Sequence, residues 1–293
     1  MKKTLISSIL LFLLMSVSAQ EEGDTIKAWT AGAVTSLNFS QVSLTNWAGG
    51  GNNSVAGTFL FKGFVNHKKD NIAWDNTLDF GYGLTKQGSE NLAKSEDRIQ
   101  LVSKFGYEAG KNWYYTVMAD FKTQFAVGYK DPIKQDITIS DFMAPGYLQL
   151  SLGMDYKPSE NFTVFLSPIT SKTTFVLNDS LSTEGAFGVD PGEKVREEYG
   201  ASAKLLAKKA DVIKNVGVYT RLDLFSSYTN NPQNIDVDWE FGISMKVNDY
   251  LSALFTCNLV YDDDIKYVSD EGIEQGARLQ VKQLFGAGLT YSF

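Results

Sequence analysis

Charged side chains of both signs recur at alternate positions along this 293-residue chain. Asp236, Asp238 and Glu240, for example, alternate with Val237 and Trp239. Residues two apart lie on the same face of an extended strand, so such segments carry charges on one face and apolar side chains on the other. The candidates for the charged face are Asp75, Asp79, Arg98, Lys104, Glu108, Asp120, Lys122, Arg221, Asp223, Asp236, Asp238 and Glu240.

Two kinds of chemistry suit charges that face one another inside a β structure. Opposite charges on neighbouring strands could pair into a rigid network that fills the interior. Alternatively, water could fill the interior, and the charges would then bias which solutes pass. The mixed signs slightly favour pairing, but both hypotheses stay open on the sequence alone.

The chain offers little for catalysis. Its only histidine, His67, lies in an expected short turn, “NHKKDN”, where we expect it to be solvated and unable to activate a nucleophile. We therefore predict no enzyme activity, no catalytic residue and no cofactor. The acidic stretch at residues 262–274 lacks the regular ligand spacing and central glycine of an EF-hand loop, so a solvated loop is favoured over a calcium site.

The elements that would position these charges are strands, because the period of two repeats about twelve times along the chain. Short connections such as “EAGKN” and “KPSEN” alternate with long ones such as residues 127–141 and 177–198. A soluble sandwich would show no such asymmetry. We predict an all-β protein: a transmembrane antiparallel β-barrel of about twelve strands over residues 31–293, with short periplasmic turns and long extracellular loops.

The N-terminus indicates export. The stretch “MKKTLISSILLFLLMSVSAQ” has two lysines, a short apolar run and a small-residue cleavage site, which predicts a signal peptide at residues 1–19. Residues 20–30 would then form a periplasmic segment. After Met15, no apolar run approaches the roughly 20 residues that a spanning helix needs. The formal charge of −7 argues against nucleic acid as a partner.

Aromatic residues near the expected strand ends on the apolar face are typical of the interfacial girdles of membrane barrels. The chain ends in “GLTYSF”, with Tyr291 and Phe293 on the apolar face. This ending resembles the signal that outer-membrane barrels present to the barrel-assembly machinery. Near the N-terminus, the glycine-rich loop with Trp47, Gly49, Gly50 and Gly51 could fold into the barrel mouth, although a flexible glycine turn with Trp47 at the membrane interface is favoured.

A family resemblance rests on “LNFSQVSLTNWAGGGNNSVAG”, on Trp74-Asp75-Asn76 and on “DYKPSENFTVFLSP”. These stretches resemble a family of Bacteroidetes outer-membrane proteins, the domain of unknown function numbered 3078. The resemblance implies the barrel fold and an outer-membrane location, and it attaches no activity.

Two functions follow from these expectations. The first is a narrow passive channel for small hydrophilic solutes, which an axial path lined by unpaired Arg98, Lys104 and Arg221 would favour. The alternative is a non-conducting structural or interaction component of an envelope complex, which interior charge pairing would favour. The expected partners are outer-membrane lipids, the assembly machinery and envelope proteins.

Overall fold

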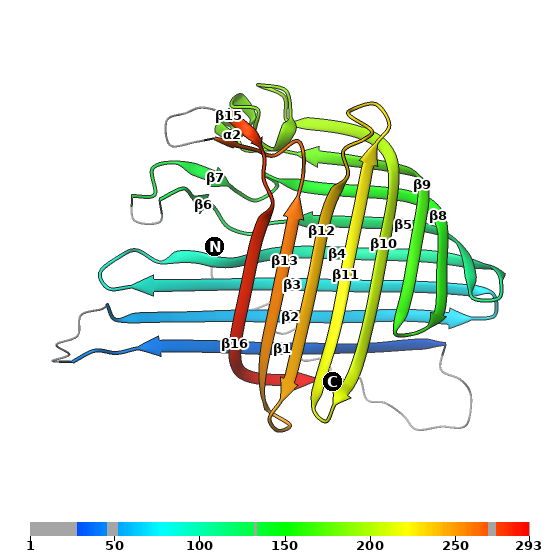
Figure 1. Ribbon diagram of the computed structural model, residues 1–293, viewed down its shortest axis with the longest axis horizontal. Helices are drawn as coiled ribbons and strands as arrows, with labels where there is room; N and C mark the ends of the chain where they lie inside the picture. The colour runs from blue at the N-terminus through cyan, green and yellow to red at the C-terminus, as the bar shows by residue number, and fades with distance from the viewer. Residues whose placement is uncertain (1–27, 46–51, 132–133, 269–273, 293) are drawn as a thin grey trace, which may run out of the picture.

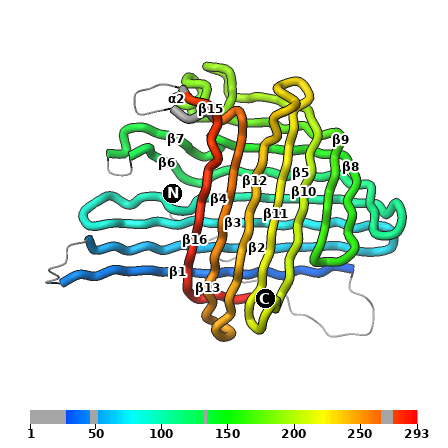
Figure 2. The backbone as a smooth tube through the Cα atoms, viewed as in Figure 1, coloured from blue at the N-terminus to red at the C-terminus, as the bar shows by residue number. Residues whose placement is uncertain are grey.

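The alternating segments of the sequence form strands. The computed structural model describes residues 28–45, 52–131, 134–268 and 274–292 (Figures 1 and 2). Twelve strands close into one antiparallel barrel, which confirms the predicted fold class and strand number. They are β1 (Trp29–Val42), β2 (Ser54–Lys69), β3 (Ile72–Gln87), β4 (Ala93–Gly110), β5 (Trp113–Thr123), β8 (Gly146–Ser159), β9 (Phe162–Phe175), β10 (Val195–Ile213), β11 (Val216–Ser227), β12 (Asp236–Lys246), β13 (Leu251–Tyr261) and β16 (Gln280–Ser292).

Each barrel strand pairs with the strands before and after it in the sequence, and β16 returns to pair with β1. In Figure 1, β10 to β13 and β16 cross in front of β1 to β5. This crossing is expected, because the strands of a closed barrel tilt in opposite directions on its near and far sides. Every part of the lumen therefore faces side chains from strands that are distant in sequence.

The connections differ between the two ends of the barrel. At one end, here the short-turn end, β2–β3, β4–β5, β8–β9 and β10–β11 are joined by two residues each. Asp70, Asn112 and Asn215 take a positive φ in three of these turns, a conformation that Asn and Asp adopt more readily than most residues. At the other end, here the long-loop end, every connection is longer. The observed alternation of lengths matches the prediction.

The long-loop end carries structure of its own. It holds the strand pairs β6 (Gly128–Tyr129) with β7 (Thr138–Ser140) and β14 (Lys266–Val268) with β15 (Glu274–Ala277). Helix α2 (Asp179–Thr183) and the 3₁₀ turn η1 (Ala186–Gly188) lie between β9 and β10. Ala144, Val176, Leu181 and Val189 pack there into a small buried cluster. These loops thus pack against one another through an apolar core of their own.

The described helices, α2 and η1, are short. Within the described residues, no helix is long and apolar enough to cross a membrane.

The outer face of the barrel is apolar. Large side chains on this face are strongly exposed, including Leu101 and Val117 in the middle of their strands. At the short-turn end, Trp29 lies near Trp74, with ring centroids 6.0 Å apart, and Trp113 lies near Tyr156, at 4.9 Å. Apolar side chains between aromatic ends are the pattern of a lipid-facing surface.

His67 differs from its predicted place. It lies inside β2 and not in a turn, and its ring centroid is 4.5 Å from that of Trp29. Its Nδ1 is buried and finds no hydrogen-bond partner in the described part of the chain. The expectation of a solvated turn residue was wrong, because β2 extends to Lys69 and brings His67 into the aromatic cluster.

Glycines permit close approach of neighbouring backbones at two places in the wall. A Cβ at Gly153 would lie 2.1 Å from the carbonyl oxygen of Leu166, and one at Gly200 would lie 2.0 Å from that of Ser226. The pairing register shifts beside both glycines, between Leu152 and Met154 and between Gly200 and Ser202. Only glycine allows such close approach of two backbones. Both shifts arise from one extra residue in β9, so the parity of the inward residues changes along β9 and stays the same along β8 and β10.

Candidate functional site

The centre of the lumen is crossed by an ion pair. Arg98 of β4 and Glu240 of β12 lie 2.6 Å apart, Nη1 to Oε2. Their strands are separated by six steps around a ring of twelve, so they lie on opposite sides of the barrel. Glu240 is only 1% exposed. The pair therefore bridges the whole lumen.

Glu240 has further partners. Arg221, from the adjacent strand β11, lies 3.4 Å from the same carboxylate, and the hydroxyl of Tyr219 donates to it at 2.8 Å. Across the lumen, Arg98 also contacts Asp79 at 3.2 Å, and Asp79 lies 3.4 Å from Lys62. The central cluster, made of Lys62, Asp79, Arg98, Tyr219, Arg221 and Glu240, thus joins five strands of the wall.

A second layer lies beside the central cluster. Lys204 of β10 contacts Asp120 of β5 at 2.8 Å and Asp223 of β11 at 3.1 Å. Gln100 donates to Asp120 at 3.0 Å. Lys122 of β5 reaches Asp238 of β12 at 2.6 Å. Because β5 and β12 are five strands apart, this contact also crosses the lumen.

Towards the short-turn end, the pairing continues. Lys104 of β4 lies 2.7 Å from Asp155 of β8, and the hydroxyl of Thr163 also donates to this carboxylate, at 2.5 Å. Lys157 of β8 pairs with Asp75 of β3. The pairing therefore extends along the axis as well as across it.

Towards the long-loop end, Lys172 of β9 reaches Asp236 of β12 at 2.7 Å and lies 3.6 Å from Asp262. Arg196 contacts Glu198 at 3.0 Å and Asp264 at 2.9 Å. These contacts tie the acidic stretch after β13 to the inner wall. The charges of this end are thus also paired.

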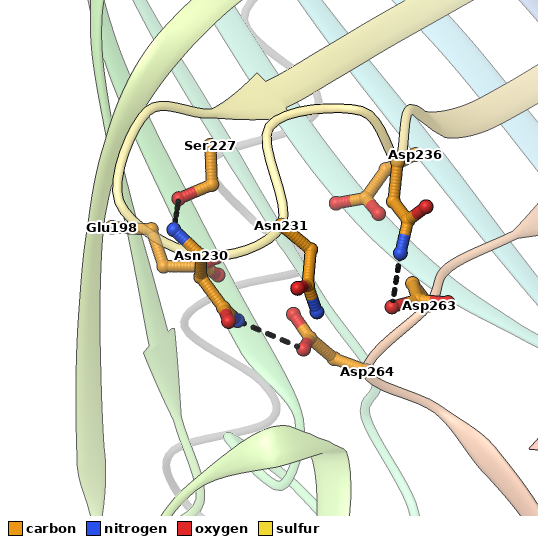
Figure 3. A pocket seen from close by; sticks show the side chains of 8 residues that line it. Glu198, Ser227, Asn230, Asn231, Asp236, Asp263 and Asp264 are labelled. Atoms are coloured by element: carbon orange, nitrogen blue, oxygen red, sulfur yellow. Dashed lines mark hydrogen bonds between the residues drawn. The ribbon is translucent and has the colours of Figure 1, made fainter.

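A polar hollow lies at this end (Figure 3). In Figure 3, Asn230 lies between Ser227, whose hydroxyl accepts from its backbone N–H at 3.3 Å, and Asp264, which accepts from its amide at 3.4 Å. Glu198, Asp236 and Asp263 also line the hollow. Among the described residues, no three His, Cys, Asp or Glu side chains are arranged to hold a metal ion. Residues 269–273 of the acidic stretch lie outside the described part of the chain.

An exposed loop carries one further ion pair. Lys194 contacts Asp179, at the start of α2, at 2.5 Å. This hydrogen bond and the lysine charge lower the pKa of the Asp179 carboxyl. Both side chains are well exposed, so the pair adds little to stability.

The structure places the predicted lumen residues as follows. All of them except Glu108 form ion pairs: Asp75, Asp79, Arg98, Lys104, Asp120, Lys122, Arg221, Asp223, Asp236, Asp238 and Glu240. Glu108 lies near the short-turn end of β4, where its backbone N–H donates to the carbonyl of Asn71. Tyr291 is exposed near the end of β16. Trp47, Gly49, Gly50, Gly51 and Phe293 lie outside the described residues.

Several inward charges were missed from the sequence. Lys172 follows the irregular Ser167–Thr170 stretch of β9, where the register shift changes the inward parity. Arg196 and Glu198 were assigned to a loop, but β10 begins at Val195. Lys282 of β16 reaches Glu96 of β4 at 2.8 Å. Arg196 and Glu198 lie an even number of residues before the inward-facing Lys204 on β10. Continuing the alternation from Lys204 back to the start of the strand would therefore have identified them as inward.

Charge is distributed unevenly around the wall. Strands β1, β2, β13 and β16 contain no Asp or Glu, and we call them the acid-free wall. Strands β3 to β5 and β8 to β12 form the paired wall. All of them except β9 contain Asp or Glu, and they supply most acids of the ion pairs inside the barrel, to which the segment after β13 adds Asp262 and Asp264. Lys62 and Lys282 of the acid-free wall reach across to acids of the paired wall and are about half exposed. The lumen is therefore filled mainly from one side.

Comparisons with known proteins give a match to a family model over part of the chain and several similar folds. Residues 39–129 match the model of the family described as protein of unknown function (DUF3078). A search of curated protein sequences finds no match. Among solved structures, the chain is similar to an outer-membrane channel from Pseudomonas putida F1, with a TM-score of 0.40 and 10% identity over 92% of this chain and 99% of that chain.

Two further solved structures are similar. The translocator domain of the autotransporter NalP from Neisseria meningitidis has a TM-score of 0.33 and 11% identity, over 99% of this chain and 95% of that domain. The NanC porin has a TM-score of 0.37 and 7% identity, over 88% of this chain and 98% of the porin.

Proposed function

We propose that this protein is an integral outer-membrane barrel that does not conduct, and that it serves as a structural or interaction component of the cell envelope. The Arg98–Glu240 pair carries the proposal, because it joins opposite sides of the lumen at 2.6 Å. A paired and buried network excludes the water that solute passage needs.

The rival function, a narrow passive channel, would need free cations along the axis. Arg98, Arg221 and Lys104 instead lie within 3.4 Å of Glu240, Glu240 and Asp155, respectively. Charges held in this way cannot steer a passing solute without first leaving their partners, and breaking a buried pair is costly. The geometry thus favours closure over passage.

The membrane location is supported by the outer face. Exposed Leu101, Val117 and Leu152 would meet water in a soluble protein, whereas a bilayer satisfies them. Export by the N-terminal signal and assembly through Tyr291 and Phe293 belong to the same proposal. The long loops then face outwards, where exposed Ile137, Ile139 and Phe142 offer an apolar surface to an envelope partner.

Conductance tests the proposal. The refolded protein is compared in a planar bilayer with an Arg98→Ala/Glu240→Ala variant that removes the central bridge. We expect no steady conductance from the wild type and measurable steps from the variant. Steady conductance of the wild type would reject closure, and its ion selectivity would then support the channel.

A further inference from the structure

The barrel closes through a short seam. Strands β1 and β16 share five residue pairs, from Val34 with Ser292 to Asn38 with Gly288. Strands β13 and β16 share ten pairs. Within the described residues, residues 280–287 of β16 therefore have no strand paired on the side that faces β1. Residues 39–42 of β1 likewise have none on the side that faces β16. In Figure 1, the two strands diverge from the lower end of β16.

The wedge between these two edges opens towards the long-loop end. The free edges expose backbone N–H and C=O groups. Such groups are costly at the level of a bilayer unless something supplies hydrogen bonds. A molecule seated in the wedge must therefore offer polar atoms to the edges and hydrocarbon to the lipid.

A buried amide marks the inner end of the wedge. Asn38 is 7% exposed, and its Nδ2 has no hydrogen-bond partner among the residues that the structure describes. Its side chain lies over Gly286, because a Cβ there would be 3.0 Å from Asn38 Cγ. Gly286 belongs to the part of β16 that β1 does not cover. A buried donor without a partner indicates a missing acceptor.

The charges near the wedge favour an anion. No strand of the acid-free wall contains Asp or Glu. Lys282 lies on the same face of β16 as Gly286, four residues away; it is paired with Glu96 of β4 at 2.8 Å, and its side chain stays 49% exposed. Phe39 and Phe285, on the outer face beside the free edges, are 63% and 70% exposed. The wedge is thus flanked by strands without acids, polar inside and apolar outside.

We propose that this wedge binds a long-chain carboxylate from the bilayer. The carboxylate accepts from the Asn38 amide and from unpaired backbone N–H groups, and the chain leaves between Phe39 and Phe285 into lipid. The site rests on the proposed function only in that the barrel lies in a membrane. It does not need a conducting lumen, because the central cluster stays closed.

Photo-crosslinking tests the site. The refolded protein is placed in phosphatidylcholine vesicles that contain palmitate with a diazirine near its carboxylate, and the labelled residues are mapped by mass spectrometry. We expect labels on inward residues beside the wedge, such as Ser40 and Leu284, in addition to outward residues around the barrel. Labels on outward residues alone would overturn the site but leave the membrane barrel intact. Labels on neither face would overturn the proposed membrane location as well.

Substitutions of Asn38 test whether its amide, and not only the gap between the strands, is needed for binding. Asn38→Leu removes the donor at similar size, and we expect inward labelling to fall about fivefold, the value of one hydrogen bond. Asn38→Asp replaces the donor with a negative charge and should reduce labelling further. Asn258→Leu is the matched control, because Asn258 also faces inward but donates to Asp238 at 3.0 Å. Folding of each variant is checked by heat-modifiable gel mobility. Equal inward labelling in folded wild type and Asn38→Leu would contradict the role of Asn38, and so would equal losses in both leucine variants.

A neutral probe tests the charge. The same palmitate as a methyl ester keeps the chain and loses the anion. We expect weaker inward labelling by the ester than by the acid. Inward labelling that is equal for both would show that the wedge binds hydrocarbon chains without selecting a carboxylate, and inward labelling by a diazirine phospholipid alone would replace the proposed ligand.

Discussion

The two walls of the barrel line the lumen with different kinds of side chains. The paired wall fills the interior with acids that are almost fully buried, such as Glu240 and Asp155, each held by a cation. The acid-free wall contributes small or apolar inward residues such as Gly286 and Leu284, and its cations Lys62 and Lys282 are about half exposed. Closure of the lumen thus depends on the paired wall, whereas the weakest join of the barrel, the β1–β16 seam, lies in the acid-free wall.

The largest effect should come from the central cluster. Glu240→Ala leaves Arg98 and Arg221 without their shared carboxylate, and an uncompensated buried charge costs about 3–5 kcal/mol. We expect a loss of this size in the free energy of unfolding, measured by urea titration in lipid vesicles. The control is Glu197→Ala in β10, where the exposed carboxylate accepts from Tyr199 at 3.0 Å. A loss for Glu240→Ala no larger than for this control would contradict the structural role of the cluster.

A backbone test compares the walls at two glycines. Gly200→Ala in β10 would place a Cβ 2.0 Å from the carbonyl oxygen of Ser226, whereas Gly57→Ala in β2 meets nothing within 4 Å. We expect Gly200→Ala to destabilise the barrel by about 1–3 kcal/mol through forced backbone movement. Gly57→Ala should be neutral or stabilise by less than about 1 kcal/mol. Urea unfolding of both variants measures the difference, and similar stabilities would mean that the close backbone approach at Gly200 is not needed.

A single charge removal in the paired wall should have an intermediate effect. Asp155→Asn keeps the shape but weakens the hydrogen bonds from Lys104 and Thr163. Hydrogen bonds to a charged group contribute about 1.5–3 kcal/mol, so the free energy of unfolding should fall within that range. A stability equal to that of the wild type would show that Lys104 finds another partner.

The smallest effect is expected in the acid-free wall. Thr256 of β13 faces inward and is partly exposed. Thr256→Val keeps the shape and removes the hydroxyl, and changes outside buried networks are usually within about 0.5 kcal/mol. Unfolding of this variant measures the baseline for the comparison. A loss as large as that of Asp155→Asn would break the distinction between the two walls.

Much of the fold was predictable, because each strand repeats the same period of two and the connections alternate in length. The inward parity was predictable wherever a strand was regular, as from Asp236 to Glu240. After the register shift near Ser167, the alternation in β9 changes phase. Lys172 was therefore not recognised as an inward residue. A local sequence pattern contains no signal for such a bulge beyond Pro168, which suggested irregularity.

The partners of the charges were not predictable. Arg98 and Glu240 are 142 residues apart, and their contact follows from closure of the barrel across six strands. The expectation of pairs between neighbouring strands describes Lys204 with Asp223, but not the bridges across the lumen. The wedge was also invisible, because the period of two continues through β1 and β16 whether or not their edges pair.

A double-mutant cycle between Arg98 and Glu240 tests the cross-lumen bridge most directly. The stabilities of Arg98→Ala, Glu240→Ala and the double variant are measured by urea unfolding in the same vesicles as the wild type. Residues in direct contact show coupling energies of about 0.5–3 kcal/mol, whereas distant residues are additive within about 0.3–0.5 kcal/mol. We predict a coupling above about 1 kcal/mol. Additive losses would contradict a lumen closed by this pair.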